Sequence, residues 1–561
     1  MVDLNIPVGV SDFEKLRENN YYYIDKTGFI SKLLQTKSAE VTLITRPRRF
    51  GKTLGMRMLA SFFDIRKDSR TIFEGLEISK NTALCDEWMN QYPTLFLSFK
   101  DVDGLTFSSA CDMLMYTISD LYQQHLYLLE SDSVNDYDKE IIHHIAERKA
   151  TVSEIKQSLV LLTKALASYY AKPVILLLDE YDVPIAKASS NGYYDQMLEI
   201  IKGMLSTSLK DNAALRFAVI TGCLRIAKES IFTGLNNFEV LSILNTQYDE
   251  AFGFTDGEVK QILEDYNLSD HYPDVKEWYD GYHFGNTDIY CPWDVIRYCK
   301  NLCADPAALP EDFWSNSSGN AMVRRFIDKA DIRTKNEIER LIAGEDIEKD
   351  ISQELTYDEI DKSIENLWSV LFTTGYLTHK GCTESGRYRL AIPNKEVRNL
   401  FIRKIREWFS DVTRNDGKTL EEFCNAFVDR DPGKIEQIFG DYLWNTISIR
   451  DTATAKAKKE NFYHGILLGL LGYKASWLIK SNAESGTGYS DILVEVPDNR
   501  TGIVIELKYA EDCDMDAACS RALEQIEEKD YVDKLRQDGM RNYIKYGIAC
   551  FKKDCKVVIG E

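Results

Sequence analysis

Short apolar runs alternate with longer helical patterns between residues 1 and 250 of this 561-residue chain. One amphipathic stretch typical of the helical pattern covers Glu154–Tyr170. The apolar runs have the length of strands and lie at 41–45, 93–99, 173–178 and 215–221. Because strands that alternate with helices form βαβ units, the pattern predicts an N-terminal α/β domain with a parallel sheet over residues 1–250.

The pattern becomes mainly helical after residue 250. A turn is predicted at 282–286, and two prolines interrupt the stretch 305–311. These features predict a helical lid and connector over residues 251–365.

Residues 366–455 combine a helix, a short strand and further helical sequence. The helix is predicted over Leu367–Leu377, with a glycine near its end, and the strand over Tyr388–Ile392. This order is typical of a winged-helix module and equally of a helical module that packs between two domains. Both interpretations remain open.

Residues 456–561 are predicted to have the order helix, three strands, helix, strand, after a boundary at Thr452–Glu460. The first helix opens near Glu460 and runs to about Leu471. Within the strands, 488–509 predicts a hairpin. The later helix is indicated by the apolar stripe Ala518, Ala522, Gln525 and Ile526.

Three polar residues converge at the open end of this hairpin. The antiparallel pairing is expected to be centred between Asn499 and Arg500, which sets Asp491 opposite Lys508. Glu506 lies two residues from Lys508 and therefore on the same face. The opposite face is expected to be buried and carries Ile503, Ile505 and Leu507.

Two carboxylates and an ammonium are the groups that a metal-dependent nuclease needs. Asp491 and Glu506 offer hard oxygen ligands for Mg²⁺ or Mn²⁺, which can activate a water, and Lys508 can position that water or stabilise a pentacoordinate phosphate. The alternative is a cross-strand ion pair without a catalytic role. His464 is expected to be structural rather than a ligand, and no Cys/His spacing predicts zinc.

From about Lys456 to Glu561 the chain resembles the PD-(D/E)XK nuclease superfamily, in the branch that follows an ATPase-like domain. The resemblance implies that Asp491 and Glu506 are the metal ligands and that Lys508 is the catalytic lysine. It implies supporting roles in the same site for Glu460 and Gln525.

The apolar run at 41–45 leads into a phosphate-loop pattern. In Arg46-Pro47-Arg48-Arg49-Phe50-Gly51-Lys52-Thr53, the backbone N–H groups at the start of the next helix can hold phosphates, Lys52 can reach the β- and γ-phosphates, and Thr53 can hold Mg²⁺. Arg46 stands where the usual pattern has its first glycine. The arginines Arg46, Arg48 and Arg49 favour an anion at this loop, either the nucleotide or a nucleic-acid backbone.

A Walker-B pattern completes the predicted nucleotide site. The run 173–178 is apolar on both faces and ends in Asp179 and Glu180, which are predicted to hold Mg²⁺ through water and to act as general base. The alternative is that both acids cap the next segment. Thr221, at the end of the run 215–221, is a candidate sensor of the γ-phosphate, and Arg225 is expected to be a surface residue.

Several motifs of residues 1–300 form a recognisable set. They are Ile6-Pro7-Val8-Gly9, Tyr23-Ile24-Asp25-Lys26-Thr27, the loop 46–53, Leu178-Asp179-Glu180-Tyr181-Asp182 and Trp278-Tyr279-Asp280-Gly281-Tyr282. Through these motifs, residues 1–300 resemble the bacterial AAA-ATPase-like family. In that family Arg-Pro-Arg-Arg is common at the loop, and the usual C-terminal companion is the nuclease-like domain.

Charge and cysteine usage narrow the environment of the protein. The formal net charge of −21 excludes nonspecific DNA binding over the whole surface, so nucleic acid would need a local basic groove, for which the candidates are the loop arginines or Lys474, Lys480 and Lys508. Twelve scattered cysteines, no signal-peptide pattern and no apolar stretch long enough to span a bilayer predict a cytoplasmic protein without a membrane partner.

The sequence thus predicts an α/β multidomain protein with a P-loop ATPase-like domain at 1–250 and a nuclease-like domain at 456–561. The predicted function is a Mg²⁺-dependent nuclease, acting on DNA rather than RNA, that binds ATP and is regulated by it. The alternative is a nucleotide-dependent switch with an inactive nuclease-like domain. ATP hydrolysis and assembly into a homo-oligomer remain open.

Overall fold

The computed structural model describes residues 5–35, 40–224, 238–314, 321–330, 332–357, 359–360, 362–414, 417–446, 456–474, 476–485, 488–510 and 513–560. The chain divides into two compact units. Unit 1 comprises Met1–Ser317 and Asp350–His379, and unit 2 comprises Ser318–Lys349 and Lys380–Glu561. Arg225 and residues 452–455 of the predicted boundary 452–460 lie outside the described residues.

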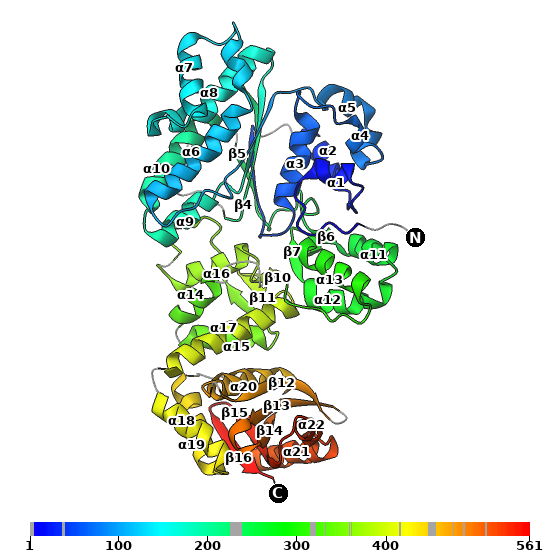
Figure 1. Cartoon of the computed structure of the whole chain (residues 1–561), viewed down its shortest axis with the longest axis vertical. Coiled ribbons are helices and arrows are strands. Elements are labelled where there is room, and N and C mark those ends of the chain that lie inside the picture. The colour runs from blue at the N-terminus through cyan, green and yellow to red at the C-terminus, as the bar shows by residue number, and fades with distance from the viewer. Residues whose placement is uncertain are drawn as a thin grey trace. The chain divides into compact units, whose positions relative to one another are not determined.

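A five-stranded sheet in the order β2-β3-β4-β1-β5 forms the centre of unit 1, and its strand pairs are parallel (Figure 1). The first four strands match the predicted apolar runs, so the predicted parallel α/β fold is confirmed. The edge strand β5 was not among the predicted strands. The strands are β1 (Val41–Thr45), β2 (Thr94–Ser98), β3 (Val174–Asp179), β4 (Leu215–Gly222) and β5 (Phe238–Leu241).

Helices cover both faces of this sheet: α3 (Lys52–Phe63) lies on one face, and α6 (Phe107–Gln123), α8 (Val152–Tyr170) and α10 (Tyr194–Leu209) lie on the other (Figure 1). Leu176 and Leu178 of β3 pack in the core formed with α6, α8 and α10. Ile175 and Leu177, which alternate with them, are also fully buried. Burial on both faces explains why this strand is a continuous apolar run.

The other helices of the N-terminal part of unit 1 are shorter. They are α1 (Phe13–Glu18), α2 (Gly28–Gln35), α4 (Arg70–Phe73), η1 (Glu77–Lys80), α5 (Thr82–Trp88), η2 (Leu126–Glu130), α7 (Asp136–Ala146) and α9 (Val183–Asn191).

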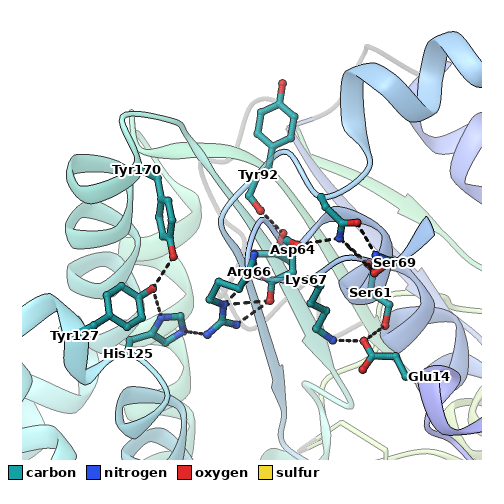
Figure 2. A network of polar contacts seen from close by, with 12 residues as sticks. Glu14, Ser61, Asp64, Arg66, Lys67, Ser69, Tyr92, His125, Tyr127 and Tyr170 are labelled. Atoms are coloured by element: carbon teal, nitrogen blue, oxygen red, sulfur yellow. Dashed lines mark hydrogen bonds and ion pairs between the residues drawn. The ribbon is translucent and has the colours of Figure 1, made fainter. Parts of the chain in front are cut away.

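A polar network anchors the C-terminal end of α3 (Figure 2). Asp64 caps the helix, and its carboxylate accepts hydrogen bonds from Arg66, at 3.1 and 3.2 Å from Nε, 2.8 Å from Nη2 and 3.0 Å from the backbone N–H. Arg66 Nη1 lies 3.5 Å from Nε2 of His125, whose Nδ1 lies 3.0 Å from the hydroxyl of Tyr127. That hydroxyl lies 3.1 Å from the hydroxyl of Tyr170 in α8. The network therefore ties α3 to the helices on the other face of the sheet.

Glu14 of α1 extends this anchoring (Figure 2). Its carboxylate accepts a hydrogen bond of 2.7 Å from Ser61 in α3 and pairs with Lys67. Because α3 begins at the phosphate loop and ends in these contacts, the direction of the helix is set at the end remote from the loop.

Residues 254–304 form a small three-stranded sheet, in the order β6-β8-β7, with helices beside it. The segment 282–286, which the sequence predicted to be a turn, is instead part of a hairpin. Phe284 pairs with Thr287, so only Gly285 and Asn286 form the loop, and Gly285 has the positive φ of 53° that such a short loop favours. The elements are β6 (Phe254–Thr255), α11 (Asp256–Asp265), η3 (Ser269–His271), α12 (Tyr272–Tyr279), β7 (Tyr282–Phe284), β8 (Thr287–Tyr290) and α13 (Pro292–Ala304).

Residues 350–379 complete unit 1. They contain α16 (Ile364–Thr373), which begins and ends before the bounds predicted for this helix, and Gly375 follows it with φ 89°. The left-handed conformation of Gly375 is typical of the residue after a helix.

The first part of unit 2 contains helices and short strands. β9 and β11 pair in an antiparallel manner, and β11 matches the predicted strand at 388–392. The winged-helix interpretation stays a prediction. The elements are α14 (Ala321–Lys329), α15 (Ile332–Ile342), β9 (Ile347–Lys349), β10 (Thr378–Cys382), whose first two residues belong to unit 1, β11 (Tyr388–Ala391) and α17 (Lys395–Arg414).

A mixed five-stranded sheet, in the order β12-β13-β14-β15-β16, forms the core of the C-terminal region. Only β14 and β15 pair in parallel. Two strands follow the last helices, where the sequence predicted one. The elements are α20 (Lys456–Leu471), β12 (Leu478–Ser485), β13 (Gly488–Val496), η4 (Pro497–Asn499), β14 (Thr501–Tyr509), α21 (Met515–Glu528), α22 (Val532–Gln537), β15 (Asn542–Phe551) and β16 (Asp554–Ile559).

Both faces of this mixed sheet are apolar. Ile503, Ile505 and Leu507 share one core with α20 and with α18 (Gly417–Val428) and α19 (Pro432–Thr446). Val504 packs on the other face with residues of α21 and α22. This core extends upstream of residue 456, and the predicted domain boundaries at 250, 365 and 455 stay predictions.

Within the described ranges, no helix combines the length and the apolar character that are needed to cross a bilayer.

Candidate nucleotide and nuclease sites

The phosphate-loop pattern lies between β1 and α3, as the sequence predicted. Gly51 is the N-cap of α3 with φ 86°, and no side chain caps the helix there. Such a helix start leaves backbone N–H groups without intrahelical partners, and together with the helix dipole they favour an anion. The loop therefore has a phosphate-binding element despite Arg46 in the place of a glycine.

Lys52 is buried at the start of α3, with 3% of its surface exposed. Its ammonium donates hydrogen bonds of 3.1 Å to the carbonyls of Arg46 and Pro47, and its Nζ lies 3.6 Å from Cys223 Sγ. Glu180 Oε1 lies 3.6 Å from the same nitrogen. Burial alone would lower the pKa of Lys52, but the neighbouring thiol and carboxylates outweigh burial and raise it, so Lys52 stays a cation.

Asp179 ends β3 fully buried and is held by hydroxyl groups from three elements. Thr53 in α3 donates to its Oδ2 at 2.8 Å, Thr221 in β4 donates to its Oδ1 at 2.7 Å, and Ser98 in β2 lies 3.4 Å from Oδ2. Burial raises the pKa of Asp179 above its ordinary value, while the two threonine hydroxyls oppose the rise. The structure thus brings together Thr53, Asp179 and Thr221, which the sequence had proposed from three distant segments.

Glu180 follows in the left-handed region of the backbone, with φ 54°. A non-glycine residue in this region carries a conformational cost of roughly 1 kcal/mol or more, and such residues cluster at functional sites. In this conformation the Glu180 carboxylate lies near Lys52. No side chain that the structure describes caps the start of the next helix, α9, so the alternative of helix capping is not supported.

The three loop arginines have different surroundings. Arg46 is fully buried, and its guanidinium donates to the backbone carbonyls of Thr45, Leu241 and Tyr248 at 2.9, 3.0 and 3.2 Å. These contacts commit the Arg46 side chain to the fold, which differs from the expected phosphate contact. Arg48 is exposed, and Arg49 lies over the ring of Trp293, 4.2 Å from its centroid.

Phe50 also differs from the expected role in the nucleotide site. Its fully buried ring packs against Tyr282 and Phe284 of the small sheet, at centroid distances of 4.9 and 5.1 Å. The Phe50 side chain therefore anchors the phosphate loop to the small sheet.

A pocket of about 360 Å³ lies beside the phosphate loop. Its volume is within the usual range for a small-molecule site. The loop side is lined by Gly51, Lys52, Thr53 and Glu180, and the other walls include Val8, Tyr23, Ile24, Pro292 and Trp293. Trp293 was not among the predicted site residues, because only the fold brings α13 to this pocket.

The nuclease hairpin has a different register from the one predicted. Val496 pairs with Thr501 and Ile492 with Ile505, so the pairing is centred between Asp498 and Asn499 and sets Asp491 opposite Glu506, not Lys508. The short helix η4 and Arg500 in the left-handed region, with φ 51°, form the connection and set this register. Because the shift is by two residues, Asp491, Glu506 and Lys508 remain on one face.

Asp491, Glu506 and Lys508 lie together at the end of this hairpin. The backbone N–H of Leu507 donates to Asp491 Oδ2 at 2.8 Å, and the N–H of Asp491 lies 3.3 Å from Glu506 Oε2. Lys508 Nζ lies 2.8 Å from Glu506 Oε1. Burial, with the neighbouring Asp491 as the second cause, raises the pKa of Glu506 to about 7 in spite of Lys508.

Glu460 and Gln525 approach the same face from the two flanking helices. Glu460 in α20 accepts a hydrogen bond of 3.0 Å from the backbone N–H of Tyr509, next to Lys508. Gln525 in α21 donates to Glu506 Oε1 at 2.5 Å. All five predicted residues of the nuclease site are therefore close to one another.

Two further residues support this arrangement. Gln525 Nε2 also lies 3.0 Å from the hydroxyl of Tyr531, which sequence analysis had not considered. His464 in α20 bonds the backbone carbonyl of Asp491 at 2.8 Å through Nε2, which must therefore carry the proton. His464 thus contacts the backbone of the site and not its carboxylates.

The carboxylate pair fits a divalent cation that keeps several waters. No group of three or more His, Cys, Asp or Glu side chains in the described part of the chain is arranged to hold a metal. Mg²⁺ is commonly bound by one or two carboxylates together with waters and substrate phosphates. Asp491 and Glu506 satisfy that requirement, and a cation would offset both the burial and the repulsion from Asp491 that raise the pKa of Glu506.

The predicted basic groove near this site is not supported by the surroundings of its other lysines. Lys480 pairs with Glu495 and Asp538 at 2.6 and 2.7 Å, and Lys474 pairs with Glu421 at 3.2 Å. Their charges are thus balanced locally by acids of unit 2.

Comparisons with known proteins match both regions of the chain. Residues 7–232 match the AAA-ATPase-like family, described as predicted AAA-ATPase, and residues 458–559 match the PD-(D/E)XK nuclease superfamily. A relative from Azotobacter chroococcum mcd 1, described as an uncharacterized protein in the vnfD 5′ region, is 25% identical over 566 residues, which cover 99% of this chain and 98% of that protein. Both resemblances inferred from the sequence motifs are confirmed: the N-terminal region is similar to predicted AAA-ATPases, and the C-terminal region is similar to the PD-(D/E)XK nuclease superfamily.

Proposed function

We propose that the protein is a metal-dependent nuclease, acting on DNA, whose activity is regulated by ATP. The observation that carries the proposal is the convergence of Asp491, Glu506 and Lys508 on one face of a hairpin, within a domain that matches a nuclease superfamily. A binding module has no evident need for two adjacent carboxylates, one with a pKa raised to about 7.

Each side chain of the nuclease site has a proposed task. Asp491 and Glu506 hold Mg²⁺ or Mn²⁺, which when bound supplies Lewis acidity and an activated water. Gln525 and Lys508 both bond Glu506 Oε1, and these contacts orient the carboxylate. Lys508 also offers a positive charge for the phosphate, and Glu460 bonds the backbone of the adjacent residue Tyr509.

ATP is the proposed ligand of the N-terminal site. The start of α3 and Lys52 bind its phosphates, and Thr53 and Asp179 hold the associated Mg²⁺. Glu180 acts as general base. Thr221, which donates a hydrogen bond to Asp179, acts as sensor of the γ-phosphate. The adjacent pocket, with Tyr23 and Trp293 in its walls, accommodates the nucleoside.

The cellular setting is part of the proposal. All twelve cysteines lie within the described residues and none is in a disulfide, which supports a reducing cytoplasm. The net charge of −21 means that DNA must be bound through a local surface, for which the exposed Arg48 is one candidate residue.

Cleavage of labelled single- and double-stranded DNA and RNA tests the proposal. The full chain is assayed with Mg²⁺ or Mn²⁺, with and without ATP, beside Lys508→Ala and the control Lys529→Ala, which removes an exposed lysine of the same domain. We expect cleavage of DNA that depends on the metal, changes with ATP and is lost in Lys508→Ala only. Equal cleavage by the parent and Lys508→Ala would refute the site, and ATP binding without any cleavage would favour a nucleotide-dependent switch.

A further inference from the structure

Residues 350–379 belong to unit 1, although the chain on both sides of them belongs to unit 2. Residues 318–349 precede the segment and residues 380–561 follow it, so unit 1 holds an insertion whose two ends continue directly into unit 2. Both ends of this segment are therefore covalently continuous with unit 2.

The segment contacts unit 1 at the carboxyl edge of its parallel sheet, beside the nucleotide site. The Tyr357 hydroxyl donates to Asp182 Oδ2 at 3.3 Å, and Gln353 accepts a hydrogen bond of 2.8 Å from Ser242, the residue after β5. A Cβ built on Gly375 would lie 2.8 Å from Pro47 Cβ of the phosphate loop. The left-handed Gly375 thus permits a close approach that another residue would prevent.

Asp182 is bonded directly to the end of β4. Its Oδ2 accepts hydrogen bonds of 3.1 Å from the backbone N–H groups of both Cys223 and Leu224, which closely follow Thr221. Its Oδ1 is buried and has no hydrogen-bond partner among the described residues. Asp182 therefore links Tyr357 to the end of β4, the strand that carries Thr221. Because its carboxylate is buried and only partly hydrogen-bonded, small shifts of these contacts change its energy strongly.

The phosphate loop is poised to shift when a phosphate binds. Lys52 has three N–H donors, and Arg46, Pro47 and Cys223 lie within hydrogen-bonding distance of its ammonium. A phosphate that takes one of these donors releases at least one of the three groups. Pro47 contacts Gly375 directly, and the N–H of Cys223 donates to Asp182, which bonds Tyr357. Two of the three groups around the Lys52 ammonium are therefore connected to residues 350–379.

We propose that residues 350–379 are a relay that responds to nucleotide at Lys52 and carries the response into unit 2. The relay rests on the proposed nucleotide binding. The contacts that would couple the nucleotide to the segment are those of Tyr357 with Asp182 and of Gly375 with Pro47. Tyr357 and Asp182 are positioning residues in this relay, because neither is among the residues proposed to bind the phosphates. The Tyr357 hydroxyl is the contact that can be removed with the least disturbance of packing.

Hydrogen exchange of the full chain, with and without Mg²⁺-ATP, tests the relay. Affinity is measured in parallel with a fluorescent ATP analogue. In the parent we expect Mg²⁺-ATP to change exchange in peptides from 350–379 by about 10-fold, as for a local opening whose free energy shifts. In Tyr357→Phe we expect the same nucleotide affinity and a much smaller change in these peptides. The control is Tyr127→Phe, which removes a hydroxyl from the network at the other end of α3 and should leave the response intact.

The outcomes separate the relay from the proposed function. Nucleotide binding with unchanged exchange at 350–379, or with an equal response in Tyr357→Phe, would overturn the relay and leave nucleotide binding in place. The absence of any nucleotide binding would overturn both. Urea unfolding of each variant checks that Tyr357→Phe is folded, and Gln353→Leu, which removes the contact with Ser242, provides a second test if it is not.

Discussion

Thr221 Oγ1 donates a hydrogen bond of 2.7 Å to Oδ1 of Asp179, and both side chains are fully buried. The two residues lie at the carboxyl ends of the neighbouring parallel strands β4 and β3, Thr221 as the penultimate residue of its strand and Asp179 as the last of its own. Thr53 satisfies the other oxygen of the same carboxylate. A substitution of Thr53 or Thr221 therefore removes a hydrogen bond from the buried carboxylate of Asp179, which water cannot replace.

Thr221→Val should destabilise unit 1. Valine preserves the shape of threonine but leaves Asp179 Oδ1 without its hydroxyl donor, and an unsatisfied buried acceptor costs about 1–3 kcal/mol. Urea denaturation should show this loss in the free energy of unfolding. Thr117→Val is the control, because Thr117 bonds only a carbonyl of its own helix at a more exposed position. Equal stability of Thr221→Val and the parent would contradict the importance of this hydrogen bond.

Lys52→Met should weaken ATP binding by about 10- to 100-fold, because a charge-assisted hydrogen bond to phosphate contributes about 1.5–3 kcal/mol. Methionine retains much of the buried stem and removes the ammonium. Isothermal titration with Mg²⁺-ATP measures the change. Lys32→Met, at a lysine whose side chain is 58% exposed, should bind as the parent does. Unchanged affinity in Lys52→Met would refute the phosphate-loop assignment.

Gln525→Leu should lower the rate of DNA cleavage by about 10- to 100-fold. The amide donates to Glu506 Oε1 at 2.5 Å, and residues that orient a metal ligand typically change affinity or activity by that factor. The cleavage rate is measured over a range of Mg²⁺ concentrations. Gln537→Leu, at an exposed glutamine of α22 that bonds only Asp533, is the matched control. A rate equal to that of the parent would remove Gln525 from the site.

Acid should destabilise the protein through His125. Burial, together with the charge of Arg66, lowers the pKa of His125 from 6.5 to about 3. As the pH falls below 6.5, the unfolded chain binds the proton first, so the stabilising contribution is present above that pH and is lost as the pH falls toward 3. The slope approaches ~1.4 kcal/mol per pH unit.

The contribution of His125 is obtained from the difference between the parent and His125→Gln in urea unfolding from pH 7 to pH 4. The difference should shrink steadily as the pH falls, because the variant lacks the titrating ring. His143→Gln, which removes a histidine whose side chain is 55% exposed, is the control variant in the same series. A difference that is independent of pH would show that folding does not lower the pKa of His125.

The sequence determined the four strands β1 to β4 of the parallel sheet and the polar face of the nuclease hairpin. A strand buried on both faces must be apolar at every position, and for that reason β3 was evident before its neighbours were known. The two-residue period of a strand placed Asp491, Glu506 and Lys508 on one face even though the predicted register was wrong by two residues. Local periodicity is preserved under such a shift.

Only the tertiary structure decided which residues meet across long separations in the chain. The burial of Arg46 depends on carbonyls of Leu241 and Tyr248, which no local pattern connects to the phosphate loop. The contact of Tyr357 with Asp182 likewise spans 175 positions. Hydrophobic periodicity specifies which face of an element is buried, but the partner of a buried polar group is set by packing between distant segments, and packing is a property of the whole fold.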